Sequence, residues 1–124
     1  MSGGIDFLLE RRVAAPELRS ALATALGVAD VEVVQDLADL VGNRPAYAVV
    51  YDAAGDFALH VSLDPRGDLE TVRAVAAALG TAALAPDDSP NPYTWILVRP
   101  DGSDEPVSLQ PDALDDDEYR LATS

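Results

Sequence analysis

The chain lacks both cysteine and lysine, so its eight basic residues are all arginine. Without a thiol it has no disulfide framework, no thiol nucleophile and no thiolate metal site. No apolar run approaches the roughly 20 residues that cross a bilayer, and no basic segment leads into a long apolar one near the first residues. We therefore expect neither a membrane span nor a signal peptide, and a cytoplasmic location. The arginine-only basic set and the many alanines suggest a bacterial host with a GC-rich genome.

Positive charge is also scarce. The 124 residues carry a formal net charge of −14, with a sequence pI near 4.1. Residues 87–124 hold ten acidic residues and two arginines, so the last third of the chain carries more than half of the net charge. This balance opposes binding to nucleic-acid phosphates and favours fast capture of a basic protein partner. The alternative is that the acidity only keeps the protein soluble or reflects the composition of its host.

The chain does contain enough apolar sequence for a core. Hydrophobic residues make up 48% of it, which excludes an ordinary disordered chain, and its length fits one domain. Alternating polarity and β-forming residues predict strands at 5–13, 31–34, 46–51, 57–63, 82–85, 93–98 and 106–109. We expect the strands at 82–85 and 106–109 to lie at sheet edges. Apolar residues at helical spacing, each set followed by a glycine, predict helices at 16–26 and 69–79.

This order of elements, β-α-β-β-β-α-β-β, predicts an α+β fold. We expect a two-layer sandwich of a mostly antiparallel sheet and two main helices. Residues 1–110 form the predicted domain, and residues 111–124 form an acidic C-terminal tail in which Leu114 and Leu121 allow a short packed helix. The stretch at 37–44 fits either a loop or one helical turn.

The order from Pro16 onward, with the small size and the acidity, resembles that of the type III secretion chaperones. This resemblance covers most of the chain, although the strand at 5–13 departs from the pattern, and it implies a chaperone-like binding protein. The paired β-α-β-β pattern also looks like the vicinal-oxygen-chelate resistance proteins, whose metal ligands are histidine and glutamate. His60 is the only histidine here, so that metal site lacks its ligands.

Aromatic side chains near the acidic segment supply candidate anchors for a partner. Tyr93 and Trp95 share one phase of the strand at 93–98, and these residue types are favoured interface anchors. The alternative is a central strand covered on both faces. The carboxylates around this strand are candidate contacts to a basic surface: Asp87, Asp88, Asp101, Asp104, Glu105, Asp115, Asp116, Asp117 and Glu118.

His60 is the only other candidate for polar chemistry. It lies on the polar phase of the strand at 57–63, where it is either a sheet-face histidine or the polar contact of a pocket with Tyr47 or Tyr51 nearby. No glycine-rich phosphate loop and no metal-ligand spacing is present, so we predict no cofactor and no metal site.

The function that fits these features best is a non-enzymatic acidic protein that masks a basic protein partner. An immunity protein or antitoxin against a toxin, or a secretion chaperone for an effector, would have this character. The alternative is a small ligand-binding domain or enzyme with a pocket between sheet and helices around His60. A homodimer formed through the sheet face is a third hypothesis.

Overall fold

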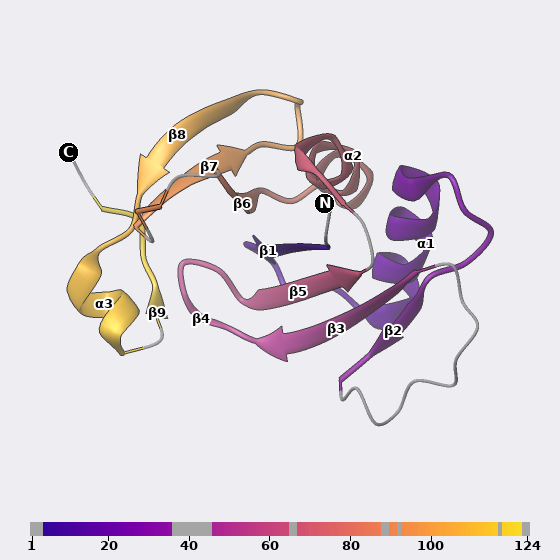
Figure 1. The fold of residues 1–124 in the computed structure, drawn as a ribbon, viewed down its shortest axis with the longest axis horizontal. Coiled ribbons are helices and arrows are strands. Elements are labelled where there is room, and N and C mark those ends of the chain that lie inside the picture. Colours follow the sequence, from indigo (N-terminus) through magenta and orange to yellow (C-terminus); the bar gives the residue numbers. More distant parts are fainter. Residues whose placement is uncertain are drawn as a thin grey trace.

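The computed structural model describes residues 4–35, 46–64, 67–87, 90–91, 93–116 and 118–122. A seven-stranded sheet has the order β2-β3-β5-β1-β6-β7-β8, in which β2 and β3 run parallel and all other neighbours run antiparallel (Figure 1). Its strands are β1 (Ile5–Leu9), β2 (Glu32–Val34), β3 (Tyr47–Asp52), β5 (Leu59–Asp64), β6 (Ala83–Pro86), β7 (Thr94–Val98) and β8 (Asp104–Ser108). A small second sheet pairs β4 (Ala54–Gly55) with β9 (Glu118–Tyr119). The helices are α1 (Ala15–Leu26), α2 (Leu69–Leu79) and α3 (Pro111–Asp115).

Local sequence explains where the two long helices begin and end. α1 has Pro16 in its first turn and ends at Gly27, which adopts the left-handed conformation that glycine tolerates best. α2 begins with a capping box. The Asp68 carboxylate accepts a hydrogen bond from the backbone N–H of Thr71, and the Thr71 hydroxyl accepts one from the backbone N–H of Asp68. Both helices lie side by side at one end of the molecule (Figure 1).

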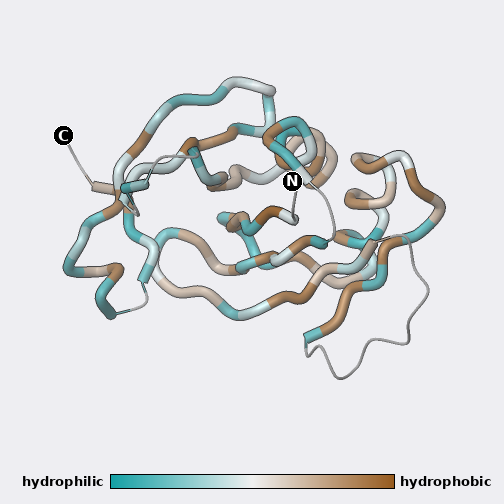
Figure 2. Tube along the Cα trace, viewed as in Figure 1, coloured by the Kyte–Doolittle hydropathy of each residue, from teal (hydrophilic) through white to brown (hydrophobic). Residues whose placement is uncertain are grey.

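The main core lies between these helices and one face of the sheet. Every second residue along each strand points toward the helices, because successive side chains alternate between the two faces of a sheet. Phe7 and Val61, in the central strands, and Leu22 and Val75, in the helices, are completely buried there. Figure 2 shows how hydrophobic residues run along these strands.

A second, smaller core lies on the other face. Leu8, Phe57, Leu84 and Leu109 are each at most 1% exposed and form its centre. The C-terminal segment contributes three further side chains that pack against it, from α3, β9 and the residues after them: Leu114, Tyr119 and Leu121. The segment predicted as an acidic tail is therefore packed onto the domain over its described residues.

The structure confirms the predicted α+β fold class, with a mostly antiparallel sheet, two long helices and a short C-terminal helix. The strand predicted at 82–85 was expected at an edge, and that was wrong. β6 lies inside the sheet, because it pairs with β1 on one side and with β7 on the other. The ambiguous stretch at 37–44 lies outside the described residues. No helix of the described part is long and apolar enough to cross a membrane.

Two glycines with similar φ angles allow a matched test of how tightly β9 packs against β4. Gly55 and Gly102 have φ values of 99° and 94°, so alanine is strained at either position. A Cβ on Gly55 would lie 2.7 Å from the Tyr119 carbonyl oxygen, whereas a Cβ on Gly102 would meet nothing within 4 Å.

We expect Gly102→Ala to lower the free energy of unfolding by about 1 kcal/mol and Gly55→Ala to lower it by at least about 2 kcal/mol. Urea unfolding of both variants measures the difference. Equal losses of unfolding free energy in the two variants would mean that β9 can move away from β4 without lowering the stability of the protein.

Candidate functional site

The acidic residues of the β7–β8 hairpin are largely engaged within the chain. Asp104 pairs with Arg73 of α2, and Glu105 pairs with Arg99. Because these carboxylates already meet a guanidinium, their charge is partly compensated before any partner arrives.

Asp101 lies in the turn of this hairpin and is held there by a neighbour. The hydroxyl and the backbone N–H of Ser103 donate to its carboxylate at 2.7 and 2.8 Å, and these bonds lower the pKa of Asp101. The lowered pKa keeps Asp101 charged in mild acid, so the stability it contributes is lost only as the pH falls through that pKa. On the other side of the turn, the hydrogen bond to Glu105 raises the pKa of Arg99.

The carboxylates in and directly after α3 differ from those of the hairpin, because no described arginine pairs with them. Asp112, Asp115 and Asp116 are exposed, and no ion pair reaches them within the part of the chain that the structure describes. Asp112 and Asp115 lie three residues apart on one face of α3, and Asp116 follows as the residue that ends the helix. In Figure 2, α3 is hydrophilic at both ends with a hydrophobic stretch between, which fits a segment held by Leu114 and charged outside.

One further described member of the predicted acidic set, Glu118, follows α3 in β9. Glu118 pairs with Arg120, its neighbour two residues on. Asp117 lies outside the described residues, as does Asp88. Sequence reasoning missed Asp112, although its position three residues before Asp115 would have placed both on one helix face.

All six described arginines already have a partner inside the chain. Arg11 donates to the Leu79 carbonyl at 2.6 Å, and the other five pair with carboxylates. These pairs are Arg12–Asp52, Arg19–Asp30, Arg73–Asp104, Arg73–Glu70, Arg99–Glu105 and Arg120–Glu118. The cations of the described chain therefore leave the α3 carboxylates uncompensated.

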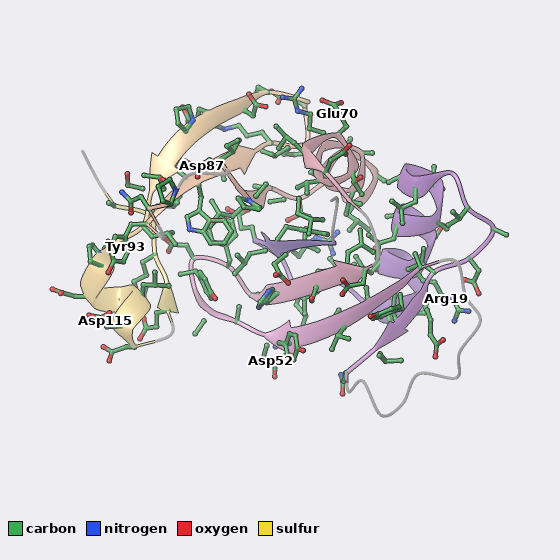
Figure 3. The ribbon with its side chains drawn as sticks, viewed as in Figure 1. Arg19, Asp52, Glu70, Asp87, Tyr93 and Asp115 are labelled. Atoms are coloured by element: carbon green, nitrogen blue, oxygen red, sulfur yellow. The ribbon has the colours of Figure 1, made fainter. Side chains whose placement is uncertain are left out.

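Of the two predicted aromatic anchors, Trp95 packs against the second core. Trp95 packs edge-on against Tyr119, with ring centroids 6.5 Å apart, and Tyr93 is half-buried just before β7. Trp95 also lines a cavity together with Asp87, so the structure brings two predicted partner-binding residues into one place. Asp87 and Tyr93 lie on the same side of the molecule as Asp115, far from Arg19 (Figure 3).

His60, Tyr47 and Tyr51 lie on the same sheet face as the second core, in β3 and β5. The His60 ring lies 5.5 Å from the ring of Tyr51, and its Nε2 atom lies 3.5 Å from a carboxylate oxygen of Asp6. Tyr51 is the most exposed large hydrophobic residue described, at 47%.

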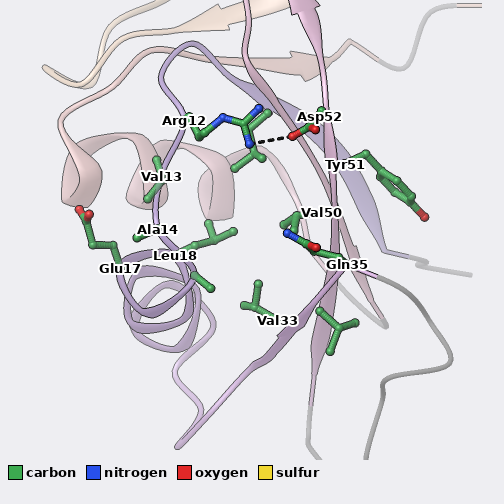
Figure 4. Close-up of a pocket in the computed structure, with 13 residues that line it drawn as sticks. Arg12, Val13, Ala14, Glu17, Leu18, Val33, Gln35, Val50, Tyr51 and Asp52 are labelled. Carbon is green, nitrogen blue, oxygen red and sulfur yellow. Dashed lines mark ion pairs between the residues drawn. The ribbon is translucent and has the colours of Figure 1, made fainter.

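A groove of about 1110 Å³ lies on the opposite side of β3, between this strand, β2 and the start of α1. Val13, Leu18 and Val50 form its floor, and an ion pair between Arg12 and Asp52 at 2.7 Å crosses its rim (Figure 4). Tyr51 is among the residues that line this groove, with its ring extending away from the other lining side chains (Figure 4), whereas His60 and Tyr47 do not line it. Of the three predicted pocket residues, only Tyr51 therefore contributes to the groove.

Two further observations bear on the chemistry of these sites. Among the described residues, no group of three histidine, aspartate or glutamate side chains is placed to hold a metal ion. Comparison of the chain with protein-family models, with curated proteins and with solved structures finds no match.

Proposed function

We propose that this chain is a non-enzymatic acidic binding protein that masks a basic protein partner in the cytoplasm. An immunity protein or antitoxin that covers the cationic surface of a toxin would work in this way, and so would a chaperone that covers a secreted effector. The partner is defined by its chemistry: a protein surface rich in arginine or lysine.

The observation that carries this proposal is the uncompensated charge of α3. Asp112, Asp115 and Asp116 are exposed, and the described arginines are all engaged elsewhere. An electrostatic field from such a group attracts a cationic surface and raises the rate of encounter.

The position of these charges also supports a role in binding. Asp112 and Asp115 lie three residues apart on α3, and like charges so placed repel one another by about 0.2–0.5 kcal/mol. Asp115 and Asp116 lie at the C-terminal end of α3, where the helix dipole disfavours negative charge. A cluster that costs stability in the free protein is expected where a partner compensates it.

The experiment is affinity capture from the host's lysate, with elution by rising salt. We expect the chain to retain a basic protein that moderate salt releases, because salt screens contacts between exposed charges. The double variant Asp115→Asn/Asp116→Asn should release this protein at clearly lower salt.

The control is Glu17→Gln/Glu70→Gln, which removes two charges from α1 and α2 at the other end of the molecule (Figure 1). Glu70 lies 3.4 Å from Arg73, which keeps Asp104 as a second carboxylate partner. This control should elute like the unsubstituted chain. Retention of no basic protein, or equal elution of both double variants, would contradict the proposal.

A further inference from the structure

The hairpin that joins β7 to β8 turns through an Asp–Gly step. Asp101 and Gly102 form the only Asp–Gly sequence in the chain, and no Asn–Gly sequence occurs. This sequence is chemically reactive, because glycine has no side chain to hinder the approach of its backbone nitrogen to the carboxyl group before it. Both residues are exposed, so water reaches the step.

The reaction open to this step is a rearrangement of the main chain. The Gly102 nitrogen attacks the side-chain carboxyl carbon of Asp101, and an N–C bond forms. The hydroxyl of the neutral carboxyl group leaves with the proton of the nitrogen, as one water, and a succinimide ring results. Water then breaks the bond from the ring nitrogen to the main-chain carbonyl carbon, which gives isoaspartate. No oxidant or reductant is consumed, and the product has the mass of the original chain.

The folded turn keeps both reacting groups engaged. The backbone N–H of Gly102 donates to the carbonyl oxygen of Arg99 at 3.0 Å, and this bond is lost when the nitrogen gives up its proton. One oxygen of the Asp101 carboxylate accepts two hydrogen bonds from Ser103, from the hydroxyl at 2.7 Å and from the backbone N–H at 2.8 Å. Ring closure therefore costs contacts at the nitrogen and at the carboxyl group.

The charge of Asp101 opposes the reaction as well. The carboxyl group reacts in its neutral form, because its oxygen then leaves as water. The Ser103 hydroxyl, and after it the Ser103 backbone N–H, lower the pKa of Asp101. At any pH near this pKa or above it, a smaller fraction of Asp101 is neutral in the folded protein than in an unfolded chain.

We propose that Asp101 is a site of spontaneous isomerisation to isoaspartate, and that Ser103 limits its rate in the folded protein. This modification site is independent of the proposed function and needs no partner. Isoaspartate lengthens the main chain by one methylene group inside the turn. The β7–β8 ladder begins directly beside the turn, with Val98 opposite Asp104, so the isomer disturbs the closing pair of the hairpin.

The first experiment compares the folded chain with the chain unfolded in guanidinium chloride, both incubated in mildly acidic buffer. Peptide mapping locates the isomer, because its peptide keeps its mass, shifts in reversed-phase chromatography and resists cleavage before Asp101 by the protease Asp-N. We expect Asp101 to isomerise about tenfold more slowly in the folded chain. Equal rates in the two states, or an unfolded chain that isomerises mainly at another aspartate, would overturn the proposal.

A substitution then tests the role of Ser103. Ser103→Ala removes the hydroxyl and keeps the backbone N–H, so we expect Asp101 to isomerise about threefold faster in the folded protein. In guanidinium chloride the rates of this variant and the unsubstituted chain should agree. The matched control is Ser108→Ala, which removes an exposed serine of β8 outside the turn and should keep the original rate.

Thermal unfolding of both variants checks that they fold. Isomerisation of folded Ser103→Ala at the original rate would overturn the role of Ser103. An equal acceleration in Ser108→Ala, or in unfolded Ser103→Ala, would overturn it too, because the effect would then not come from the hydrogen bonds of the turn.

Discussion

Replacing Phe57 by alanine is expected to lower the free energy of unfolding by about 3–5 kcal/mol. The Phe57 side chain is 1% exposed and joins the sheet residues Leu8 and Leu84 to the C-terminal segment. Its removal leaves a cavity that these neighbours cannot fill without moving. The loss is a large share of the roughly 5–15 kcal/mol that holds a domain together.

Urea unfolding followed by Trp95 fluorescence measures this loss, because Trp95 packs in the same cluster against Tyr119. Hydrogen exchange at Tyr119 and Leu121 should rise as well, since their side chains rest on the second core. Tyr51→Ala is the control, because Tyr51 is 47% exposed at the other end of the sheet face. We expect this substitution to lower the free energy of unfolding by less than about 1 kcal/mol. Equal losses of unfolding free energy in the two variants would contradict the claim that Phe57 anchors the C-terminal segment to the sheet.

The helices and most strands could be predicted from sequence because their signals are local. The capping box of Asp68 and Thr71, and Gly27 and Gly80 after the last helical turns, all act within a few residues. The place of β6 in the sheet has no such signal. Two of its four residues pair with β1, which is distant in the sequence, and nothing within the segment distinguishes an edge strand from an interior one.

The candidate site could be predicted only in part for the same reason. The concentration of carboxylates after residue 86 is visible in the composition. Which of them lack a cation is not, because Arg73 and Asp104 meet across 31 positions and neutralise one another. The cavity beside Trp95 is likewise lined by Asp6 and Asp87, which are far apart in the sequence. They come together only through the order of the strands in the sheet.

Reversing charge on α3 should have the largest effect on function. In Asp115→Lys/Asp116→Lys, four units of charge change at the end of the molecule that carries the uncompensated carboxylates. We expect the association rate with the captured basic partner to fall about tenfold or more at low salt, because the steering field weakens or changes sign. The dissociation rate should change less, since exposed charges act mainly on encounter.

The association rate is the most direct test of whether the α3 carboxylates steer a basic partner to this protein. It is measured by stopped flow at several salt concentrations, with Glu17→Lys/Glu70→Lys as the control. We expect only the α3 variant to bind about tenfold more slowly at low salt, and we expect the rates to converge near about 0.5 M salt, where exposed charges are screened. Association rates that agree within about twofold at every salt concentration would contradict steering by the α3 carboxylates.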